Sequence, residues 1–299
     1  MSVRQSRVGP PEGWWGSRPK AALVALVLAL AVGLSSGVPS EAVLASTASQ
    51  LVDPSSLDRL LDLYVRDGLV YYAALRVERS GLDRFVASLA DAPPGFDGWP
   101  LNDLKAYWVN AYNALVLRTV IDHYPIRGRS PEYPVNSIRQ IPGAFEQRRH
   151  AVAGRSLSLD ELKHSLAAFA DPRLFLALGR GAVDSGRLLS ETYAAATLEE
   201  QLEAVLGEFA TTPRHVDLER LGQEVRVSPI FGWRENEFVT AYADGGWGDS
   251  GRTPLERAIL TAIEPKLFPS EREFLRRNDF TLQYHEFDWR LNDLTGGRP

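Results

Sequence analysis

The most unusual polar residues of this sequence lie in an apolar segment, Tyr107-Trp-Val-Asn-Ala-Tyr-Asn113. Asn110 and Asn113 are three residues apart, so in a helix their side chains share one face. Asparagine is unfavourable inside a helix because its amide competes for backbone hydrogen bonds. The two amides therefore either face a ligand or bridge the backbone of a buried loop, and we favour the structural bridge. Trp108 and Tyr112, from the same segment, are candidate binding residues.

Histidines are the next candidates for chemistry, and none of them forms a His-Glu-x-x-His metal pattern. Glu161 and His164 share one face of an expected helix, with the spacing used in di-metal bundles. Such bundles need a second pair, and the chain has no other Glu-x-x-His. We therefore expect no metal site and no cofactor, with Glu161 capping the helix and His164 at its edge. The five histidines are His123, His150, His164, His215 and His285.

Nucleophilic catalysis has little support in the sequence. The chain has no cysteine, which removes thiol nucleophiles and thiolate metal ligands. Gly179-Arg-Gly181 lacks the third glycine of a phosphate-binding loop and a capped helix after it, so we interpret it as a turn. Ser185 is a candidate nucleophile, but a serine needs a histidine oriented by an acid, and this proximity is a property of the fold.

Composition and charge limit the class of protein and its partners. The 299 residues are 44% hydrophobic and 24% charged, which is typical of a globular chain. The net charge of −5 argues against nucleic acid as the main partner, because phosphate binding needs a basic surface. No other feature of the sequence identifies a partner.

The N-terminal segment predicts export. Four basic residues precede Ala21–Leu34, a run without a polar side chain, and Val43-Leu44-Ala45 offers small residues for cleavage by a signal peptidase. We expect residues 1–45 to be a signal peptide, followed by a linker over 46–55. The alternative is a retained anchor that attaches the protein to the inner membrane through residues 21–38. Either form places the protein outside the cytoplasm, as a periplasmic or secreted protein.

Helical signals dominate the rest of the chain. Apolar spacing predicts helices over 57–68 and 101–123, and capping boxes predict helix starts at Ser158, Thr197 and Ser270. Alternating residues predict a hairpin from His215–Glu219 and Glu224–Ser228, and further strands at 149–152 and 280–284. The expected fold class is α+β: a predominantly helical single domain, 56–299, with a small antiparallel sheet, preceded by an N-terminal signal or anchor helix.

Several motifs, which follow one another along the chain, resemble the bacterial and plant family catalogued as domain of unknown function 547. Together they extend over nearly the full length of the chain after the leader. The resemblance brings no established reaction. The stretches are Tyr64-Val-Arg-Asp-Gly-Leu-Val-Tyr-Tyr72, Tyr107-Trp-Val-Asn-Ala-Tyr-Asn-Ala-Leu115, Ser137-Ile138, Leu157-Ser-Leu-Asp-Glu-Leu-Lys-His164, Asp171-Pro-Arg173, Val227-Ser-Pro-Ile-Phe-Gly-Trp233 with Glu237-Phe238, and Phe287-Asp-Trp-Arg-Leu-Asn292.

The chain departs from the family's usual pattern at four positions. Similar proteins usually carry a histidine where this sequence has Phe175, and a pair of cysteines where it has Arg180 and Ser185. The usual glutamate before the helix histidine is Lys163. If the family's chemistry uses these groups, this chain has lost it, and Ser185 is at most a weaker nucleophile than a thiolate.

Two hypotheses follow. The first is a non-catalytic exported binding or scaffold protein, because thiol and imidazole groups are replaced. The second is a hydrolase or transferase that combines the Asn110, Asn113 and His164 side chains with further polar groups; these are Asp171, Arg173 or His285. Candidate binding residues beyond the 107–113 segment are Arg173, Arg180, Trp233 and His285. For Arg173 we favour an ion pair within its turn, and we expect Asp288, Trp289 and Asn292 to anchor the C-terminal segment.

Overall fold

The structure is a computed structural model that describes residues 54–296. The expected signal or anchor segment, 1–45, and the attachment segment, 21–38, lie outside these residues. Within 54–296, no helix is long and apolar enough to cross a membrane.

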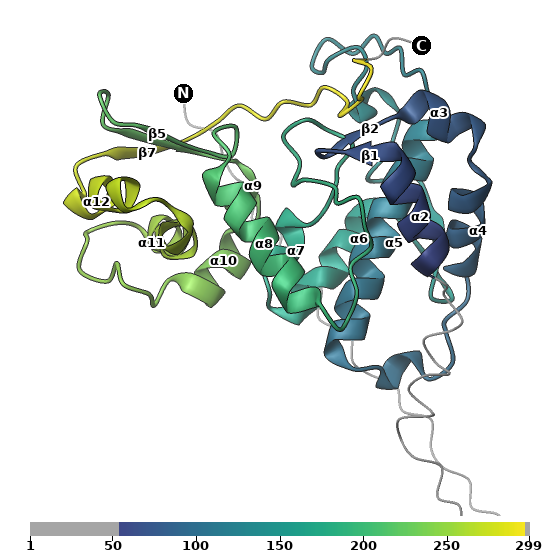
Figure 1. Ribbon diagram of the computed structural model, residues 1–299, viewed down its shortest axis with the longest axis horizontal. Coiled ribbons are helices and arrows are strands. Elements are labelled where there is room, and N and C mark those ends of the chain that lie inside the picture. Colours follow the sequence, from purple (N-terminus) through teal and green to yellow (C-terminus); the bar gives the residue numbers. More distant parts are fainter. Residues whose placement is uncertain (1–53, 297–299) are drawn as a thin grey trace, which may run out of the picture. The chain divides into compact units, whose positions relative to one another are not determined.

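The longest helix, α5 (Leu101–Ile121), is buried on nearly all sides. A helix that is apolar on nearly all sides is typical of a core element, and α3, α4 and α6 pack against α5 (Figure 1). The other helices are α2 (Pro54–Tyr64), α3 (Tyr72–Val77), α4 (Ser80–Ser88), α6 (Leu159–Ser165), α7 (Arg173–Leu176), α8 (Leu198–Thr211), α9 (Ile230–Trp233), α10 (Glu235–Tyr242), α11 (Pro254–Ile263) and α12 (Pro269–Arg277), with 3-10 turns η1 (Phe96–Gly98), η2 (Ile138–Gln140), η3 (Leu166–Phe169) and η4 (Glu264–Lys266).

Strands are short and form three small sheets in the described part of the chain. Two are antiparallel hairpins, β1–β2 and β3–β4, and the third has the order β5-β6-β7. The strands are β1 (Val65–Arg66), β2 (Leu69–Val70), β3 (His150–Val152), β4 (Arg155–Leu157), β5 (Val216–Glu219), β6 (Glu224–Val227) and β7 (Thr281–Tyr284). The α+β class and the predicted β5–β6 hairpin are confirmed.

The expectation of a purely antiparallel sheet is wrong for β7, which pairs parallel with β6. The reason is the connection between these strands: four helices, α9 to α12, cross over and return the chain in the same direction. The first predicted helix also ends earlier than expected, at Tyr64. Asp67 and Gly68 adopt positive φ angles of 51° and 78° and form the turn of the β1–β2 hairpin instead.

Of the three capping boxes predicted from the sequence, one is present in the structure. At α6, Ser158 Oγ accepts a bond from the Glu161 amide, and Glu161 accepts one from the Ser158 amide. The Thr197 side chain makes no capping bond at the start of α8. Helix α12 begins at Pro269, before Ser270, because Glu271 accepts the bond from the Phe268 amide.

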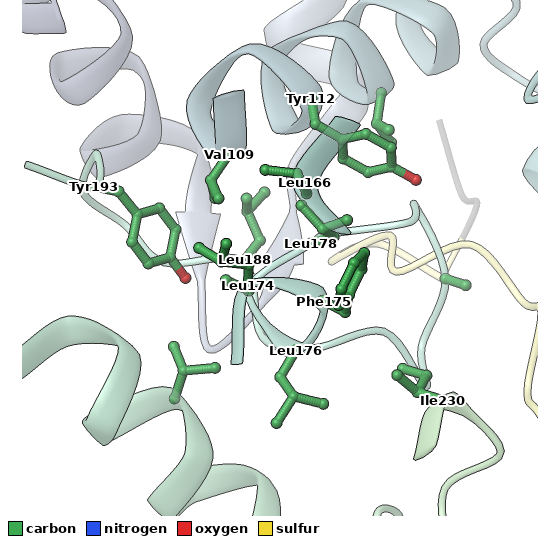
Figure 2. Close-up of a cluster of buried hydrophobic side chains, with 14 of the residues drawn as sticks. Val109, Tyr112, Leu166, Leu174, Phe175, Leu176, Leu178, Leu188, Tyr193 and Ile230 are labelled. Atoms are coloured by element: carbon green, nitrogen blue, oxygen red, sulfur yellow. The ribbon is translucent and has the colours of Figure 1, made fainter. Parts of the chain in front are cut away.

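Helix α7 and the segment that follows it run through the core, as the cluster of buried side chains in Figure 2 shows. Leu174, Phe175, Leu176 and Leu178 are completely buried, and they pack beside residues of α5 such as Val109. A buried loop must satisfy its backbone groups with partners other than water. The side chains of α5 supply those partners at the site described below.

The C-terminal segment after β7 crosses back to the β1–β2 hairpin (Figure 1). Asn292 fixes this return: its Oδ1 accepts a 2.8 Å bond from the Tyr72 hydroxyl, and its Nδ2 donates to the Gly68 carbonyl at 2.8 Å. On the way, the Asp288 amide donates to the Asp184 carboxylate at 2.7 Å. The expected anchoring role of Asn292 is confirmed, whereas the Asp288 carboxylate pairs with Arg290 of the same segment. The segment also brings Trp289 beside Phe145.

Candidate functional site

Both asparagines of α5 bridge loop backbone. Asn110 Nδ2 donates to the Tyr193 carbonyl at 2.8 Å, and its Oδ1 accepts from the Tyr193 amide at 2.9 Å. Asn113 Nδ2 donates to the Ala177 carbonyl at 3.1 Å, and its Oδ1 accepts from the Gly179 amide at 2.8 Å. Each side-chain amide thus satisfies one carbonyl and one N–H of a buried loop, as the backbone of a neighbouring strand would. This is the structural interpretation of the two amides.

The Asn113 bridge holds the loop that carries Arg180 into the protein interior. The Arg180 backbone amide donates to Ser185 Oγ at 2.9 Å. Its guanidinium donates to the carbonyls of Leu178 and Phe175 at 3.2 and 3.1 Å. Arg180 is only 4% exposed, so its charge lies in a low-dielectric environment.

A cavity of about 250 Å³ lies beside Arg180. Its walls come from α5, η2, α6, the loop after α7, the α9–α10 junction and the C-terminal segment. Its lining contains no carboxylate and no serine, threonine or cysteine. The lining residues are Tyr112, Arg139, Phe145, Lys163, His164, Arg180, Trp233, Arg234 and Trp289.

Arg180 is the cation of this cavity whose charge is not balanced. Within residues 54–296, no carboxylate lies within ion-pair distance of Arg180, and the bonds of its guanidinium go to backbone carbonyls. Burial lowers the pKa of Arg180 to about 10, because a buried cation loses its hydration. The side chain still carries a full positive charge at neutral pH. An uncompensated buried charge is unfavourable unless an anion joins it.

Tyr112 presents a second unsatisfied group to the same cavity. The residue is completely buried, yet its hydroxyl has no hydrogen-bond partner among the described residues. Figure 2 shows this hydroxyl turned away from the labelled aliphatic side chains of the cluster. Burial raises the pKa of Tyr112 to about 12, so the hydroxyl keeps its proton and can donate it to an acceptor.

The other three cations of the cavity each have a carboxylate partner outside its lining. Lys163 Nζ lies 2.5 Å from Asp160, and Arg234 lies 3.4 Å from Glu237. Arg139 forms an ion pair with Glu146, while its Nε is buried without a hydrogen-bond partner in the described chain. Burial lowers the pKa of Lys163, and the bond to Asp160 acts in the opposite direction.

Aromatic rings form one wall of the cavity. Trp289 lies 6.2 Å from Phe145 and 6.2 Å from Trp233, measured between ring centroids. The guanidinium of Arg139 lies 4.5 Å from the Phe145 centroid and 4.8 Å from the Trp289 centroid. Such cation–π contacts fix the guanidinium against the wall. Trp233 is 47% exposed and forms the mouth of the cavity.

Four of the ten candidate residues from the sequence lie in the lining of this cavity. They are Tyr112, His164, Arg180 and Trp233. His164 is exposed at the rim, and its Nδ1 is 2.7 Å from the Asp160 carbonyl. Ser185 lies behind the lining, where its Oγ accepts the Arg180 amide.

The remaining candidates lie outside the lining. Trp108 is buried against Phe96, with 5.8 Å between ring centroids. Arg173 bonds Asp171 at 3.0 Å and Glu199 at 2.6 Å, which is the ion pair that we favoured for it. His285 follows β7, and its amide donates to the Val227 carbonyl. Of the polar residues that the hydrolase hypothesis combines, only His164 lines this cavity.

Sequence reasoning did not select five of the lining residues as site candidates: Arg139, Phe145, Lys163, Arg234 and Trp289. A weak signal existed for most of them. Arg139 and Arg234 directly follow the stretches Ser137-Ile138 and Val227–Trp233, and Lys163 was singled out as a departure from the family pattern. Trp289 was assigned to the C-terminal anchor. For Phe145 no sequence feature indicates the role.

A larger cavity of about 660 Å³ lies elsewhere, near the C-terminal segment. Its lining includes Gly296, the last described residue, and two of its polar groups pair with each other: the Tyr124 hydroxyl donates to Asp293 at 2.8 Å. Convergence of polar groups, rather than size, marks a binding site. We therefore take the cavity beside Arg180, the cationic cavity, as the candidate site.

The six lining residues from Tyr112 to Arg180 fall within one stretch of sequence that a known family shares. Residues 96–210 match the family model described as "Protein of unknown function, DUF547". Comparisons with curated proteins and with solved structures found no match. The match covers part of the chain, so the expectation of a nearly full-length resemblance is not met.

Residues 96–210, called the DUF547 region below because they match this family model, contain the helix α5, the helix α6 and the loop of Arg180. The resembling stretches 64–72, 227–233 and 287–292 lie outside it. Trp233, Arg234 and Trp289 close the cavity from outside this region. The DUF547 region thus supplies the buried cation, and the rest of the chain supplies most of the aromatic wall.

Proposed function

We propose that this protein is an exported, non-catalytic binding protein of the DUF547 family, and that the cationic cavity binds a small anion. The observation that carries the proposal is the pairing of Arg180, a buried cation without a carboxylate partner, with the unsatisfied Tyr112 hydroxyl. An anion in the cavity would satisfy both groups at once.

The departures from the family pattern support a binding role. The replacements Lys163 and Arg180 both line the cavity. Phe175, in place of the usual histidine, lies 4.3 Å beneath the Arg234 guanidinium, and its carbonyl accepts from Arg180. Ser185 accepts the Arg180 amide. The four positions at which the resemblance implies a replacement therefore lie around Arg180, and such replacements would turn a site for thiol or imidazole groups into a cationic one.

The same geometry argues against the hydrolase or transferase alternative. A serine nucleophile needs a basic partner within hydrogen-bond reach, and the Ser185 hydroxyl is engaged by backbone behind the cavity lining. Lys163 is one of the lining residues with a nucleophilic atom, and its ion pair with Asp160 favours the ammonium form. These contacts suit the retention of an anion rather than covalent chemistry.

Anion binding is expected to change the fluorescence of Trp233 and Trp289, which line the cavity. We would titrate the purified full-length chain with acetate, benzoate and inorganic phosphate at constant ionic strength, with acetamide as the neutral control. Saturable changes for at least one anion, absent for acetamide, are the expected result. No saturable response to any anion would refute the binding site. Ester hydrolysis that disappears in His164→Ala would refute the non-catalytic role.

Export rests on the expected leader, 1–45, with its apolar run Ala21–Leu34. Residues 1–50 fused to alkaline phosphatase, an enzyme that is active only outside the bacterial cytoplasm, are expected to give active phosphatase. A charge in the apolar run, as in Leu28→Arg, is expected to abolish this activity, because the run must enter an apolar environment. Equal activity of both fusions, or none in either, would contradict export.

A further inference from the structure

We propose that the ligand of the cationic cavity is a small monocarboxylate with one aromatic ring: the carboxylate lies between Arg180 and Tyr112, and the ring packs against Trp289 and Phe145. This inference rests on the proposed anion-binding function and specifies its ligand class. Four features of the cavity lead to it: the balance of charge, the geometry of the hydrogen-bond donors, the aromatic wall and the volume.

Charge balance favours a single negative charge. The lining contains four cations, Arg139, Lys163, Arg180 and Arg234, and three of them pair with the carboxylates of Glu146, Asp160 and Glu237. The local sum, 4 − 3, is +1, with His164 taken as neutral. A carboxylate neutralises this charge, whereas a phosphate dianion would leave an unbalanced negative charge in a half-buried site.

Donor geometry also suits a carboxylate. A guanidinium has five N–H groups, and the bonds to Leu178 and Phe175 account for two of those on Arg180. The Tyr112 hydroxyl adds one more donor without a partner among the described residues. A carboxylate has two oxygens, so one can accept from Arg180 and the other from Tyr112.

The wall and the volume define the rest of the ligand. Trp289 and Phe145 present aromatic surface, and ring pairs at such a wall favour stacked or edge-to-face contact. The Arg139 guanidinium lies close to both of these rings, and a guanidinium also attracts the face of a further ring. The cavity of about 250 Å³ is smaller than the sites of drug-sized ligands, about 300–1,000 Å³. One ring and one carboxylate therefore suit it.

Isothermal titration of the full-length chain with five probes tests the ligand class. The probes are phenylacetate, its neutral analogue phenylacetamide, acetate, phenyl phosphate and inorganic phosphate. We expect phenylacetate to bind at least tenfold more tightly than each of the other four. Phenylacetamide lacks the negative charge of phenylacetate, and acetate lacks its ring. The two phosphates can carry a second negative charge, so they test the charge balance.

Two variants assign the contacts. Tyr112→Phe removes an unsatisfied hydroxyl, so we expect at least a fivefold loss of phenylacetate affinity with an unchanged or higher melting temperature. Trp289→Leu is expected to reduce the preference for phenylacetate over acetate. Tyr71→Phe, which changes an exposed tyrosine, is the matched control and is expected to leave binding unchanged.

Failure of this inference differs from failure of the proposed function. Equal affinity for acetate and phenylacetate, or tighter binding of either phosphate, would overturn the ligand class while anion binding stands. Unchanged phenylacetate affinity in Tyr112→Phe would overturn the assigned position of the carboxylate. If none of the four anions binds, both the ligand class and the anion-binding function are refuted.

Discussion

Replacing Asn113 with alanine is expected to lower the free energy of unfolding by about 2–6 kcal/mol, because it leaves two buried backbone groups unpaired at about 1–3 kcal/mol each. These groups are the Ala177 carbonyl and the Gly179 amide, which the Asn113 side chain bridges. Asn113 is 4% exposed, so water cannot easily replace the lost bonds. Urea unfolding of the wild-type and variant chains measures the difference.

A matched control exists on the same helix. Asn102, in the first turn of α5, is exposed, and Asn102→Ala is expected to change stability by less than about 0.5 kcal/mol. Hydrogen exchange gives a local readout, because the Gly179 amide should lose protection in Asn113→Ala more than amides in α11 do. Similar stabilities of the two variants would show that the bridge adds nothing to the fold.

Replacing Asp171 with asparagine is expected to cost about 3–5 kcal/mol, the typical result of breaking one side of a buried ion pair. The Asp171 carboxylate receives Lys105 Nζ at 2.9 Å and Arg173 Nε at 3.0 Å. Lys105 is 8% exposed, and Asp171 is its carboxylate partner in the described structure. The variant therefore leaves a buried ammonium group without a counter-charge.

The pH dependence of this effect has a definite sign. Burial alone would raise the pKa of the Asp171 carboxyl, but the bonds from Arg173 and Lys105 outweigh it and lower the pKa below its ordinary value. In the unfolded chain the pKa of this carboxyl returns to about 3.9. The stabilisation is therefore complete above about pH 4 and is lost as the pH falls through the lowered value.

Chemical unfolding of both chains at a series of pH values tests this sign. The stability difference between wild type and Asp171→Asn is expected to be constant from pH 7 to about pH 5 and to shrink below about pH 4. Glu273→Gln is the control, because it breaks an exposed pair with Arg277 and should cost only about 0.3–0.5 kcal/mol. A difference that grows on acidification would contradict the lowered pKa.

Local rules predicted much of the secondary structure. Apolar periodicity located α5, and alternation around a glycine turn located the β5–β6 hairpin, because both signals depend only on near neighbours in sequence. The same rules failed where tertiary pairing decides. The parallel partner of β6 is set by a crossover of four helices, which no local pattern encodes.

The sequence likewise predicted some features of the candidate site and missed others. The sequence alone marked Asn110 and Asn113 as residues that need partners, and it marked Lys163 and Arg180 as departures from a resembling family. It offered a bridge to buried loop backbone as one role of these amides without indicating which loops they meet, and it did not indicate that Trp289 from the C-terminal segment lies beside Phe145. Those contacts join residues far apart in the chain.

The sequence by itself determined the class of fold and the polar residues inside apolar segments, while the address outside the cytoplasm stays a prediction. Only the tertiary structure decided which cations keep a counter-charge. Three of them meet a carboxylate and Arg180 does not. The physical reason is that charge compensation in a low-dielectric interior depends on distances of a few ångströms between segments, which spacing along the chain does not specify.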